Sequence, residues 1–507
     1  MGVEGCAEVG MIYLNLTEGS EGGSGIKDAA DMDLFSFNKS LRPRCFIYFT
    51  WDKNINREQV DHDHGHDDDL IKIKTVDCSS DNMEMIKLKL MLVTVVYLSL
   101  FLDNVLLTVV VPIIPDYLCS IGENSTDENG RVGLLLSSKA LVQLLLNPLV
   151  GSLTFTVGYF KPLFIGNLCL LLAALLFAFG RSYEFLFLAR SIQGVSSACI
   201  GVSGMSMVAA QYSDEEERSR IMGFVLGAIA LGVLVGYPIG SILYDIEGKM
   251  APFLLISSLI LIPLSFQIFL WDVETVPKDV IKSENSTSWT KLLFQGKILI
   301  IAGAILASTS PMAILEPCLP IWLRSNIKPE KWQLGMVFIP DSIGYLLGTN
   351  CFGMTAYRYG RCKTAVVAMT LIGVSVILLP TATTMGQLVI PHLGMGLGIG
   401  IADAALVPLL ASFVDQDGNY GPVYSVQQVA VSLAYSLGPI VGSELVRMIG
   451  FQWVMRIVGL INLAYCPLLI YLAITTKKYL LSQDVKDYDS IVKTDLQYKR
   501  FQDDDDL

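Results

Sequence analysis

Long apolar blocks are the feature of this sequence that most limits what it can fold into. The stretch from Leu90 to Ile114 carries a single formal charge, and the blocks at 162–180, 388–410 and 454–474 are similar. Each can cross a hydrocarbon core of about 30 Å, which takes about 20 helical residues. With 52% hydrophobic and 17% charged residues, the chain is too apolar for an ordinary soluble protein of 507 residues. The sequence predicts an all-α membrane protein.

Polar breaks divide the apolar blocks into about twelve predicted spans of roughly 20 to 28 residues each. An even number of spans places both termini on one side of the membrane. The first 86 residues are polar and show no cleavable signal peptide, so both termini are predicted to be cytosolic. Lys and Arg beside the spans favour the same orientation. The spans are predicted to begin near residues 90, 132, 161, 184, 220, 251, 298, 333, 364, 388, 421 and 451.

The chain is predicted to have five parts. Its net charge of −12 comes largely from two acidic tails. The His- and Asp-rich run at 61–66 has no second cluster to close a metal site, so no metal is expected. Asn124, in an Asn-Ser-Thr sequon, is the predicted glycosylation site. The parts are a disordered cytosolic tail at 1–86, a six-helix bundle at 87–271, a cytosolic linker at 272–297, a second six-helix bundle at 298–476 and an acidic cytosolic tail at 477–507.

The two predicted bundles echo each other in sequence. Gly232-Val-Leu-Val-Gly-Tyr-Pro-Ile-Gly240 in the fifth span corresponds to Leu437-Gly-Pro-Ile-Val-Gly442 in the eleventh. Asn147-Pro-Leu-Val-Gly151 through Gly158-Tyr-Phe-Lys161 corresponds to Gly353-Met-Thr-Ala-Tyr-Arg-Tyr-Gly-Arg361. Transporters use repeated halves to build a site at mid-membrane that opens to each side in turn.

The Gly-Pro pattern resembles the antiporter motif of major facilitator proton exchangers, and the loop echo resembles the cytosolic gate motif of that superfamily. The first gate copy has Thr154, Phe155 and Thr156 where the superfamily has an acid and an arginine. The resemblance implies a gate or hinge role for Gly232, Gly236, Pro238, Gly240, Gly438 and Pro439.

Four stretches look more specifically like the vesicular monoamine transporters. The resemblance runs from about Leu90 to Leu472 and implies a major facilitator fold of two six-helix halves, with no enzymatic activity. It implies proton-coupled antiport of cationic monoamines from the cytosol into acidic secretory or synaptic vesicles. The stretches are Leu102-Asp-Asn-Val-Leu-Leu-Thr-Val-Val-Val-Pro-Ile-Ile-Pro115, Ser138-Lys-Ala, Leu315-Glu-Pro-Cys-Leu-Pro-Ile-Trp322 and Lys331-Trp-Gln-Leu-Gly335.

Ionisable residues inside spans are costly, so they are candidates for function. Asp103, with Asn104 beside it, could pair with a protonated amine, and the resemblance places the amine-binding acid there. Asp403 is the first choice for the proton carrier and Glu316 for a substrate contact, because desolvation favours the protonated form of a carboxylate. The alternative for each acid is a purely structural role, in which it pairs with a residue of a neighbouring helix. Lys139 lies two turns into the second span and is expected to take part in proton coupling.

The resemblance adds other residues to the expected substrate site. Arg190 in the fourth span matches a charged position that the family sets against its central acids, although it could also reach water. The aromatic faces of Trp322, Tyr345 and Tyr435 could contact a cation and its ring, although such residues more often pack or face lipid.

One position departs from the family in a way that affects Lys139. Where the family has an acid in the eleventh span that pairs with this lysine, the chain has Gln428. Lys139 then either becomes neutral more easily or finds another acid. We hypothesise that Asp341, at a position where the family usually has a small residue, replaces the lost acid.

The expected energy source is a proton gradient, because no Gly-rich nucleotide-binding loop occurs in the chain and no cofactor is expected. The expected partners are a small cationic amine, protons and the lipid bilayer, with sorting adaptors on the C-terminal tail and no nucleic acid. The main alternative is a vesicular acetylcholine transporter, because Ala434-Tyr-Ser-Leu-Gly-Pro-Ile-Val441 and Pro115-Asp-Tyr117 look closer to it. A broad organic cation/proton exporter is the third possibility. A receptor or membrane enzyme would need a ligand domain, metal cluster or nucleophile that the sequence does not show.

Overall fold

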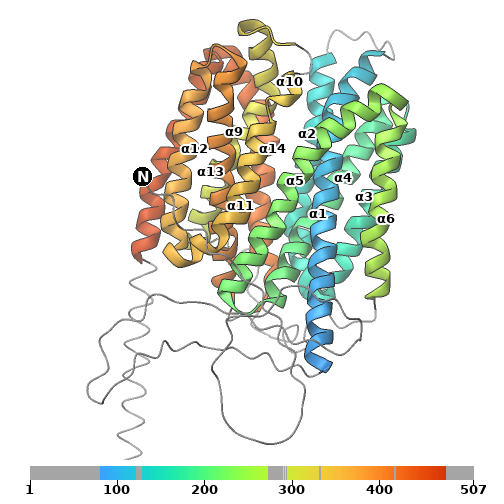
Figure 1. The fold of residues 1–507 in the computed structure, drawn as a ribbon, viewed down its shortest axis with the longest axis vertical. Helices are drawn as coiled ribbons and strands as arrows, with labels where there is room; N and C mark the ends of the chain where they lie inside the picture. The colour runs from blue at the N-terminus through green and yellow to red at the C-terminus, as the bar shows by residue number, and fades with distance from the viewer. Residues whose placement is uncertain are drawn as a thin grey trace, which may run out of the picture. The chain divides into compact units, whose positions relative to one another are not determined.

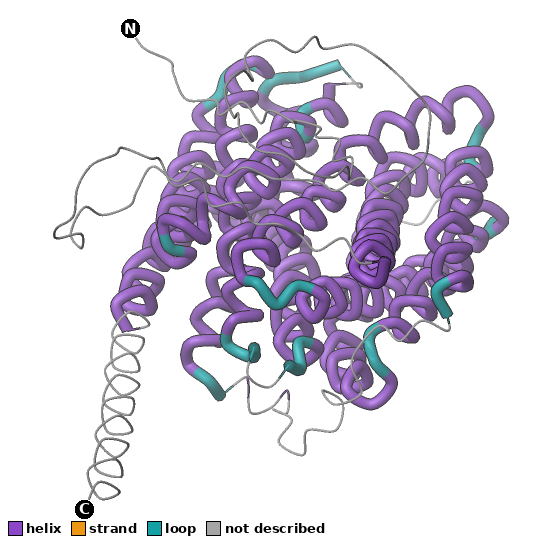
Figure 2. Tube along the Cα trace, turned by 60° about the horizontal axis from the view of Figure 1, so that its bottom comes forward, coloured by secondary structure: helices purple, strands orange, loops and turns teal. Residues whose placement is uncertain are grey.

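The computed structural model describes residues 80–120, 128–271, 289, 292, 294–330, 333–415 and 418–475. In this part of the chain all regular elements are helices, and Figure 2 shows no strand. The chain divides into two units, Met1–Leu90 and Met91–Leu507, and the arrangement below is that of the second. The predictions for the tail at 1–79, for Asn124, for the linker at 272–288 and for the tail at 477–507 fall outside the described residues.

The helices are long, and eleven in the described residues are long and apolar enough to cross a membrane. The 21-residue helix α11 also has membrane length, which gives the twelve that the sequence predicts. In chain order the helices are α1 (Ser80–Ser120), α2 (Glu128–Val157), α3 (Phe160–Phe179), α4 (Tyr183–Gln211), α5 (Glu215–Glu247), α6 (Met250–Phe269), α9 (Gly296–Asn326), α10 (Gln333–Met336), α11 (Ile339–Tyr359), α12 (Arg361–Leu378), the 3-10 helix η1 (Leu379–Thr381), α13 (Met385–Ser412), α14 (Gly421–Ile449) and the helix Phe451–Thr475.

The eighth span starts later than predicted. The sequence predicts a span from residue 333, but the structure has the four-residue helix α10 there, and α11 begins at Ile339. Pro340 explains the boundary, because a proline is favoured in the first turn of a helix, where no backbone N–H is needed.

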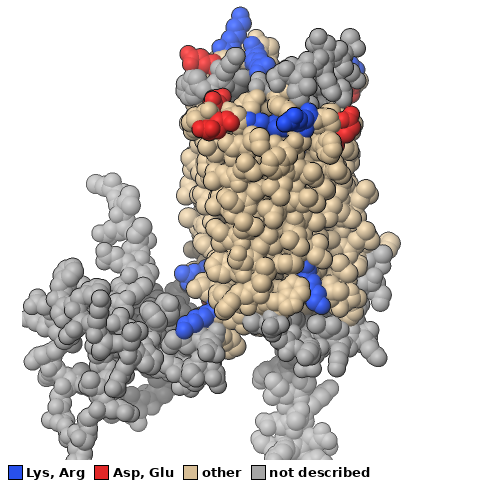
Figure 3. Space-filling model, turned by 90° about the vertical axis from the view of Figure 1, so that its right-hand side faces the viewer, with Lys and Arg blue, Asp and Glu red and all other residues tan. Residues whose placement is uncertain are grey.

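Successive long helices run in alternating directions, which defines two ends of the bundle (Figure 1). We call one the α2–α3 end; it holds the connections at 158–159, 212–214, 360 and 413–420. The other is the α1–α2 end, with the connections at 180–182, 248–249, 327–338 and 382–384. Figure 3 shows Lys and Arg near both ends of one face and Asp and Glu near one end, with a wide band free of all four between. Such a band suits a hydrocarbon core.

The helices pack as two halves, which lie side by side in Figure 1. In the first half α3 packs against α4 and α6, and α2 packs against α4. In the second half α13 packs against α11 and α12, and α9 packs against α14. The halves meet where α2 contacts α14 and where α5 contacts α11 and α13. Several of the polar residues predicted to carry function lie on helices at these contacts: Lys139 on α2, Asp341 and Tyr345 on α11, Asp403 on α13, and Gln428 and Tyr435 on α14.

Glycines hold α1 close to α5 in the first half. A Cβ on Gly232 would lie 2.6 Å from the carbonyl oxygen of Phe101, and one on Gly240 would lie 3.1 Å from Cα of Val109. Gly236, between them, packs against the side chain of Thr108. Since small residues let helix backbones approach closely in a membrane, these three glycines set the α1–α5 contact.

The second half uses the equivalent device. A Cβ on Gly438 or on Gly442 would lie 2.8 Å from Ala313 Cβ or from Ile314 Cγ2, respectively, on α9. The motif echo read from the sequence therefore corresponds to the same kind of contact, α1 on α5 and α9 on α14.

Candidate functional site

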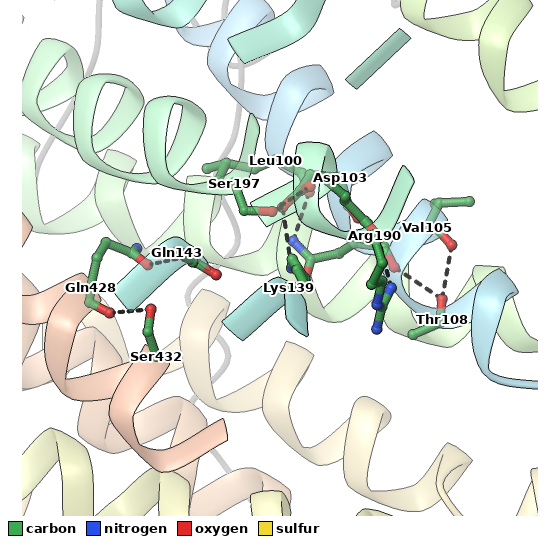
Figure 4. Close-up of polar contacts among 12 residues, drawn as sticks. Leu100, Asp103, Val105, Thr108, Lys139, Gln143, Arg190, Ser197, Gln428 and Ser432 are labelled. Carbon is green, nitrogen blue, oxygen red and sulfur yellow. Dashed lines mark hydrogen bonds and ion pairs between the residues drawn. The ribbon is translucent and has the colours of Figure 1, made fainter. Parts of the chain in front are cut away.

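Asp103 is the centre of a buried polar group in the first half (Figure 4). The hydroxyl of Ser197, on α4, donates to its carboxylate oxygens at 2.7 and 2.8 Å. The Nζ atom of Lys139, on α2, lies 3.7 Å from Asp103 Oδ2. Asp103 is 5% exposed and Lys139 8% exposed. A paired carboxylate at this depth combines a fixed negative charge with partners that a cation could displace.

Arg190 lies beside this group on α4. Its side chain is 3% exposed, and its terminal nitrogen donates to Gln193 Oε1 at 2.8 Å. The Nε2 atom of Gln193 in turn donates to the backbone carbonyl of Asp103 at 3.4 Å. Arg190 interacts electrostatically with both Asp103 and Glu316. The guanidinium is therefore buried within electrostatic reach of acids in both halves. It does not reach water, which one interpretation of the sequence had allowed.

The second half presents two half-buried carboxylates, each bonded to a tyrosine. Tyr237, on α5, donates to Glu316 Oε1 on α9 at 2.9 Å. Tyr345, on α11, donates to Asp403 Oδ2 on α13 at 2.7 Å. Tyr435, on α14, interacts electrostatically with both acids. The structure therefore brings four of the predicted residues, Glu316, Asp403, Tyr345 and Tyr435, into one neighbourhood.

Gln428 takes part in an uncharged contact between α2 and α14 (Figure 4). Its Oε1 accepts a hydrogen bond of 3.2 Å from Gln143, and its backbone carbonyl accepts one of 2.7 Å from Ser432. Asn147 donates to the hydroxyl of Ser432 at 3.0 Å. We call these four residues the amide contact. It joins the two halves without any formal charge.

The acid that pairs with Lys139 is Asp103, not the one that the sequence suggested. Asp341 is buried in the first turn of α11, and its backbone lies against Gly396 of α13. In the described part of the chain no ion pair joins Asp341 to Lys139. The expected compensation is absent because Asp341 lies nearer the α1–α2 end, whereas Asp103 already faces Lys139 from α1.

Two other predicted residues make contacts of a different kind. The side-chain amide of Asn104 donates to the carbonyl of Leu100, in its own helix, at 2.8 Å. Trp322 stacks on Phe451 with ring centroids 4.9 Å apart and an interplanar angle of 25°. These contacts bind Asn104 to the α1 backbone and Trp322 to the following helix, and neither involves one of the central acids.

Charged contacts join the halves at the α2–α3 end. Arg218, at the start of α5, donates to both carboxylate oxygens of Asp415 at 2.7 and 2.6 Å. Tyr420 donates to Asp415 at 2.9 Å. Arg361, at the start of α12, lies 3.2 Å from Glu215 and donates to Ser219 at 2.9 Å. A bidentate Arg-carboxylate pair has a fixed geometry, so it holds the two halves in register.

Close packing and tyrosines complete this end. Thr154, in the first copy of the gate motif, lies against Gly421 of α14. The backbone N–H of Tyr420 donates to the hydroxyl of Tyr159 at 3.2 Å. Burial raises the pKa of Tyr159 to about 12 and, together with Asp415, raises the pKa of Tyr420. Both hydroxyls therefore stay neutral, and Thr154 supplies a packed contact where the motif's acid and arginine are missing.

Sequence reasoning missed Ser197, Tyr237 and Asp415. Ser197 is one of many small polar residues in α4, and only the α1–α4 packing shows that it faces Asp103. Tyr237 stood within the quoted Gly-Pro motif, but its partner Glu316 lies 79 positions away. Asp415 follows α13, and an acid in such a connection is ordinarily interpreted as a solvent-exposed loop residue. No local signal identified these three residues.

The site consists of groups that can bind ions and hydrogen-bonding ligands. Carboxylates, a lysine, an arginine and tyrosines face one another across the two halves. Among the described residues no group of three or more His, Cys, Asp or Glu could hold a metal ion.

Comparison with known proteins gives the context of this arrangement. The family model of the Major Facilitator Superfamily matches residues 93–325 and 301–487. The Synaptic vesicular amine transporter of Rattus norvegicus is 38% identical over 450 residues, covering 75% of this chain and 87% of the relative. The Probable vesicular acetylcholine transporter-B of Danio rerio is 38% identical over 389 residues, covering 75% and 78%. The crystal structure of the human organic anion transporter MFSD10 superposes with a TM-score of 0.61 at 20% identity, covering 75% of this chain and 99% of that one.

Proposed function

Because this chain belongs to the major facilitator superfamily and, within it, to the family of the vesicular amine transporters, we propose that it loads a cationic monoamine into acidic vesicles in exchange for protons. The amines in question are serotonin, dopamine, noradrenaline, histamine or an invertebrate equivalent. The observation that carries the proposal is the placement of Asp103 against Lys139 in one half, with Lys139 within electrostatic reach of Glu316 in the other.

Asp103 is the proposed anchor for the substrate ammonium. Its ion pair with Lys139 is 3.7 Å long, while Ser197 holds the carboxylate from the other side. An amine could take the place of Lys139 without leaving Asp103 unpaired, which would be costly at this depth. Arg190 and Glu316 complete the proposed substrate site, with Tyr435 as an aromatic wall.

Asp403 is the proposed proton carrier. A carboxylate withdrawn from water favours its protonated form, so it can be loaded from an acidic compartment and emptied into a neutral one. Tyr345 donates a hydrogen bond to this carboxylate at 2.7 Å. Because the central acids can hold either protons or the amine but not both at once, the movement of protons is coupled to the movement of the amine.

The coupling supplies the energy that uptake needs. Concentrating a cation against a positive interior must draw on a gradient. Each pH unit is worth about 1.4 kcal/mol per proton. A membrane potential adds about 2.3 kcal/mol per 100 mV for each charge moved.

We place the α2–α3 end in the cytosol, following the Lys and Arg residues beside the spans. With Arg218 bonded to Asp415 and Thr154 packed on Gly421, this end is closed in the structure. The glycine contacts of α1 with α5 and of α9 with α14 support the proposed hinge motifs, because they let each pair move as one body. We infer a multi-pass protein of synaptic or secretory vesicles with both termini cytosolic.

Uptake of labelled serotonin into acidified vesicles that contain the protein tests the proposal. Uptake should require the pH gradient, vanish with a proton ionophore and be lost in Asp403→Asn. The matched control is Asp245→Asn, which makes the same change at an exposed acid of α5 and should leave uptake unchanged. Accumulation that ignored the pH gradient would contradict proton exchange.

The second candidate is transport of acetylcholine. It is favoured by the 38% identity to the Danio rerio protein, equal to that of the Rattus norvegicus relative. Labelled acetylcholine in the same vesicles separates the two candidates. Acetylcholine uptake without serotonin uptake would replace the monoamine proposal.

A further inference from the structure

Tyr237 links the two halves near the α1–α2 end through two different contacts. Its hydroxyl donates to Glu316 Oε1 at 2.9 Å, joining α5 to α9. Its ring stacks on Phe338, immediately before α11, with centroids 6.1 Å apart and an interplanar angle of 17°. Phe338 stacks in turn on His392 of α13 at 6.2 Å. One side chain of the first half thus touches two segments of the second.

The backbone around Tyr237 allows this link to open. Gly236 packs α5 against α1, so the helix is held on its other side. Pro238 follows within the same helix and has no N–H to donate to the carbonyl of residue 234. A helix with a missing backbone bond bends at that point more easily than an uninterrupted one. Tyr237 therefore lies where α5 can bend while Gly236 stays packed against α1.

The hydroxyl of Tyr237 occupies an acceptor site on Glu316, the acid proposed above to contact the substrate. Glu316 also interacts electrostatically with Arg190 and Lys139, so its charge is already shared among donors of the first half. A carboxylate offers about four acceptor sites on its two oxygens, and the Tyr237 hydroxyl occupies one of those on Oε1. An ammonium or hydroxyl that binds Glu316 through this site must displace the tyrosine.

Resting on the proposed function, we propose that Tyr237 is a competitor for Glu316 that sets substrate affinity and latches the α1–α2 end. Substrate that takes Glu316 releases the Tyr237 hydroxyl. Tyr237 then keeps its stacking on Phe338 but no longer joins α5 to α9, and the end facing the vesicle interior can open. The latch makes opening of that end depend on an occupied site.

Tyr237→Phe tests this directly, because it removes the hydroxyl and keeps the ring that stacks on Phe338. The KM for labelled serotonin should fall by about a factor of ten, the change expected when one hydrogen bond to a charged group no longer competes. The matched control is Tyr465→Phe, whose hydroxyl donates to the backbone carbonyl of Ile300 at 2.9 Å. Its KM should stay within about twofold of the unchanged protein, a difference of under 1 kcal/mol.

Combining Tyr237→Phe with Glu316→Gln distinguishes competition for Glu316 from a general effect of the substitution on the fold. In Glu316→Gln an uncharged amide replaces the carboxylate, so adding Tyr237→Phe should change KM far less than it does when Glu316 is present. An unchanged KM in Tyr237→Phe would overturn the proposal, as would an equal fall in the Glu316→Gln background. Loss of maximal rate alone would also overturn it, because that marks a structural role. Absence of serotonin uptake by the unsubstituted protein would instead refute the proposed function, and the competition with it.

Discussion

The hydroxyl of Ser197 lies 2.7 and 2.8 Å from the two carboxylate oxygens of Asp103, so a side chain of α4 fixes the orientation of an acid on α1. Lys139 approaches the same carboxylate only to 3.7 Å. The shorter contact of Asp103 is therefore its hydrogen bond with the neutral Ser197, and the longer contact is its ion pair with Lys139. A substrate cation could replace Lys139 while Ser197 holds Asp103 in position.

Replacing Ser197 by Ala should weaken substrate binding. The carboxylate would lose a donor to a charged group, and we expect the KM for labelled serotonin to rise by roughly tenfold. Ser196→Ala is the matched control, because its buried hydroxyl has no hydrogen-bond partner in the described structure. Equal changes in the two variants would show that Ser197 acts through packing rather than through Asp103.

Replacing Asp415 by Asn should loosen the α2–α3 end. Arg218 is buried there, so loss of the opposing charge leaves it uncompensated at a cost of roughly 2 kcal/mol or more. The midpoint of thermal unfolding in detergent should fall, together with the maximal rate of uptake. Glu444→Gln removes a pair of the same length on α14, between side chains 54% and 78% exposed, and should cost under about 1 kcal/mol. A drop as large in Glu444→Gln would contradict the role of the Arg218 pair.

Gly236→Ala should separate α1 from α5. The added Cβ would meet the side chain of Thr108 and lie 3.0 Å from the carbonyl oxygen of Val105, which costs about 1–3 kcal/mol of overpacking. Gly386→Ala, at the start of α13 where nothing lies within 4 Å, should change stability by less than about 1 kcal/mol. Thermal unfolding measures both variants. Equal stability of the two would mean that the α1–α5 contact adapts to the extra carbon.

Lys249, in the α5–α6 connection, should titrate unusually low. Its Nζ lies 3.9 Å from the centroid of the Tyr117 ring and donates to the carbonyl of Gly180. Burial, and then the charge of Arg181, lower the pKa of Lys249 from 10.5 to about 8. Between these values the folded chain binds fewer protons than the unfolded one, so the contribution of Lys249 to stability rises with pH across that window.

Acetylation followed by site-resolved mass spectrometry measures this pKa. The reactive neutral amine should appear with a midpoint near pH 8, and Arg181→Gln should move the midpoint upward. A midpoint at the ordinary value for lysine, about 10.4, would show that the site is hydrated.

The apolar blocks predicted the membrane helices, and the resemblance to the vesicular monoamine transporters predicted the major facilitator fold, which the family match confirms. Asp103, Lys139, Glu316 and Asp403 could be chosen as candidates because an ionisable residue stands out in an apolar run. The sequence could not predict their partners. The Ser197 bond and the Tyr237 bond depend on which face of one helix meets which face of another.

Asp341 was predicted from the sequence as a partner of Lys139, but the structure does not place the two side by side. Its residue type made it a reasonable partner for Lys139, but the late start of α11 at Ile339 places it in the first turn of that helix. The boundary came from Pro340 and from the separate helix α10, which an apolar count does not resolve. Depth along the membrane axis, rather than charge, decided the pairing.

The amide contact of Gln143, Asn147, Gln428 and Ser432 has an electrical consequence. Separating these side chains moves no formal charge through the membrane field, whereas displacing one charge across it is worth about 2.3 kcal/mol per 100 mV. Breaking the amide contact is therefore itself insensitive to voltage. Any dependence of the transport rate on membrane potential must arise from the charged groups around Asp103 and Glu316 and from the ions they carry.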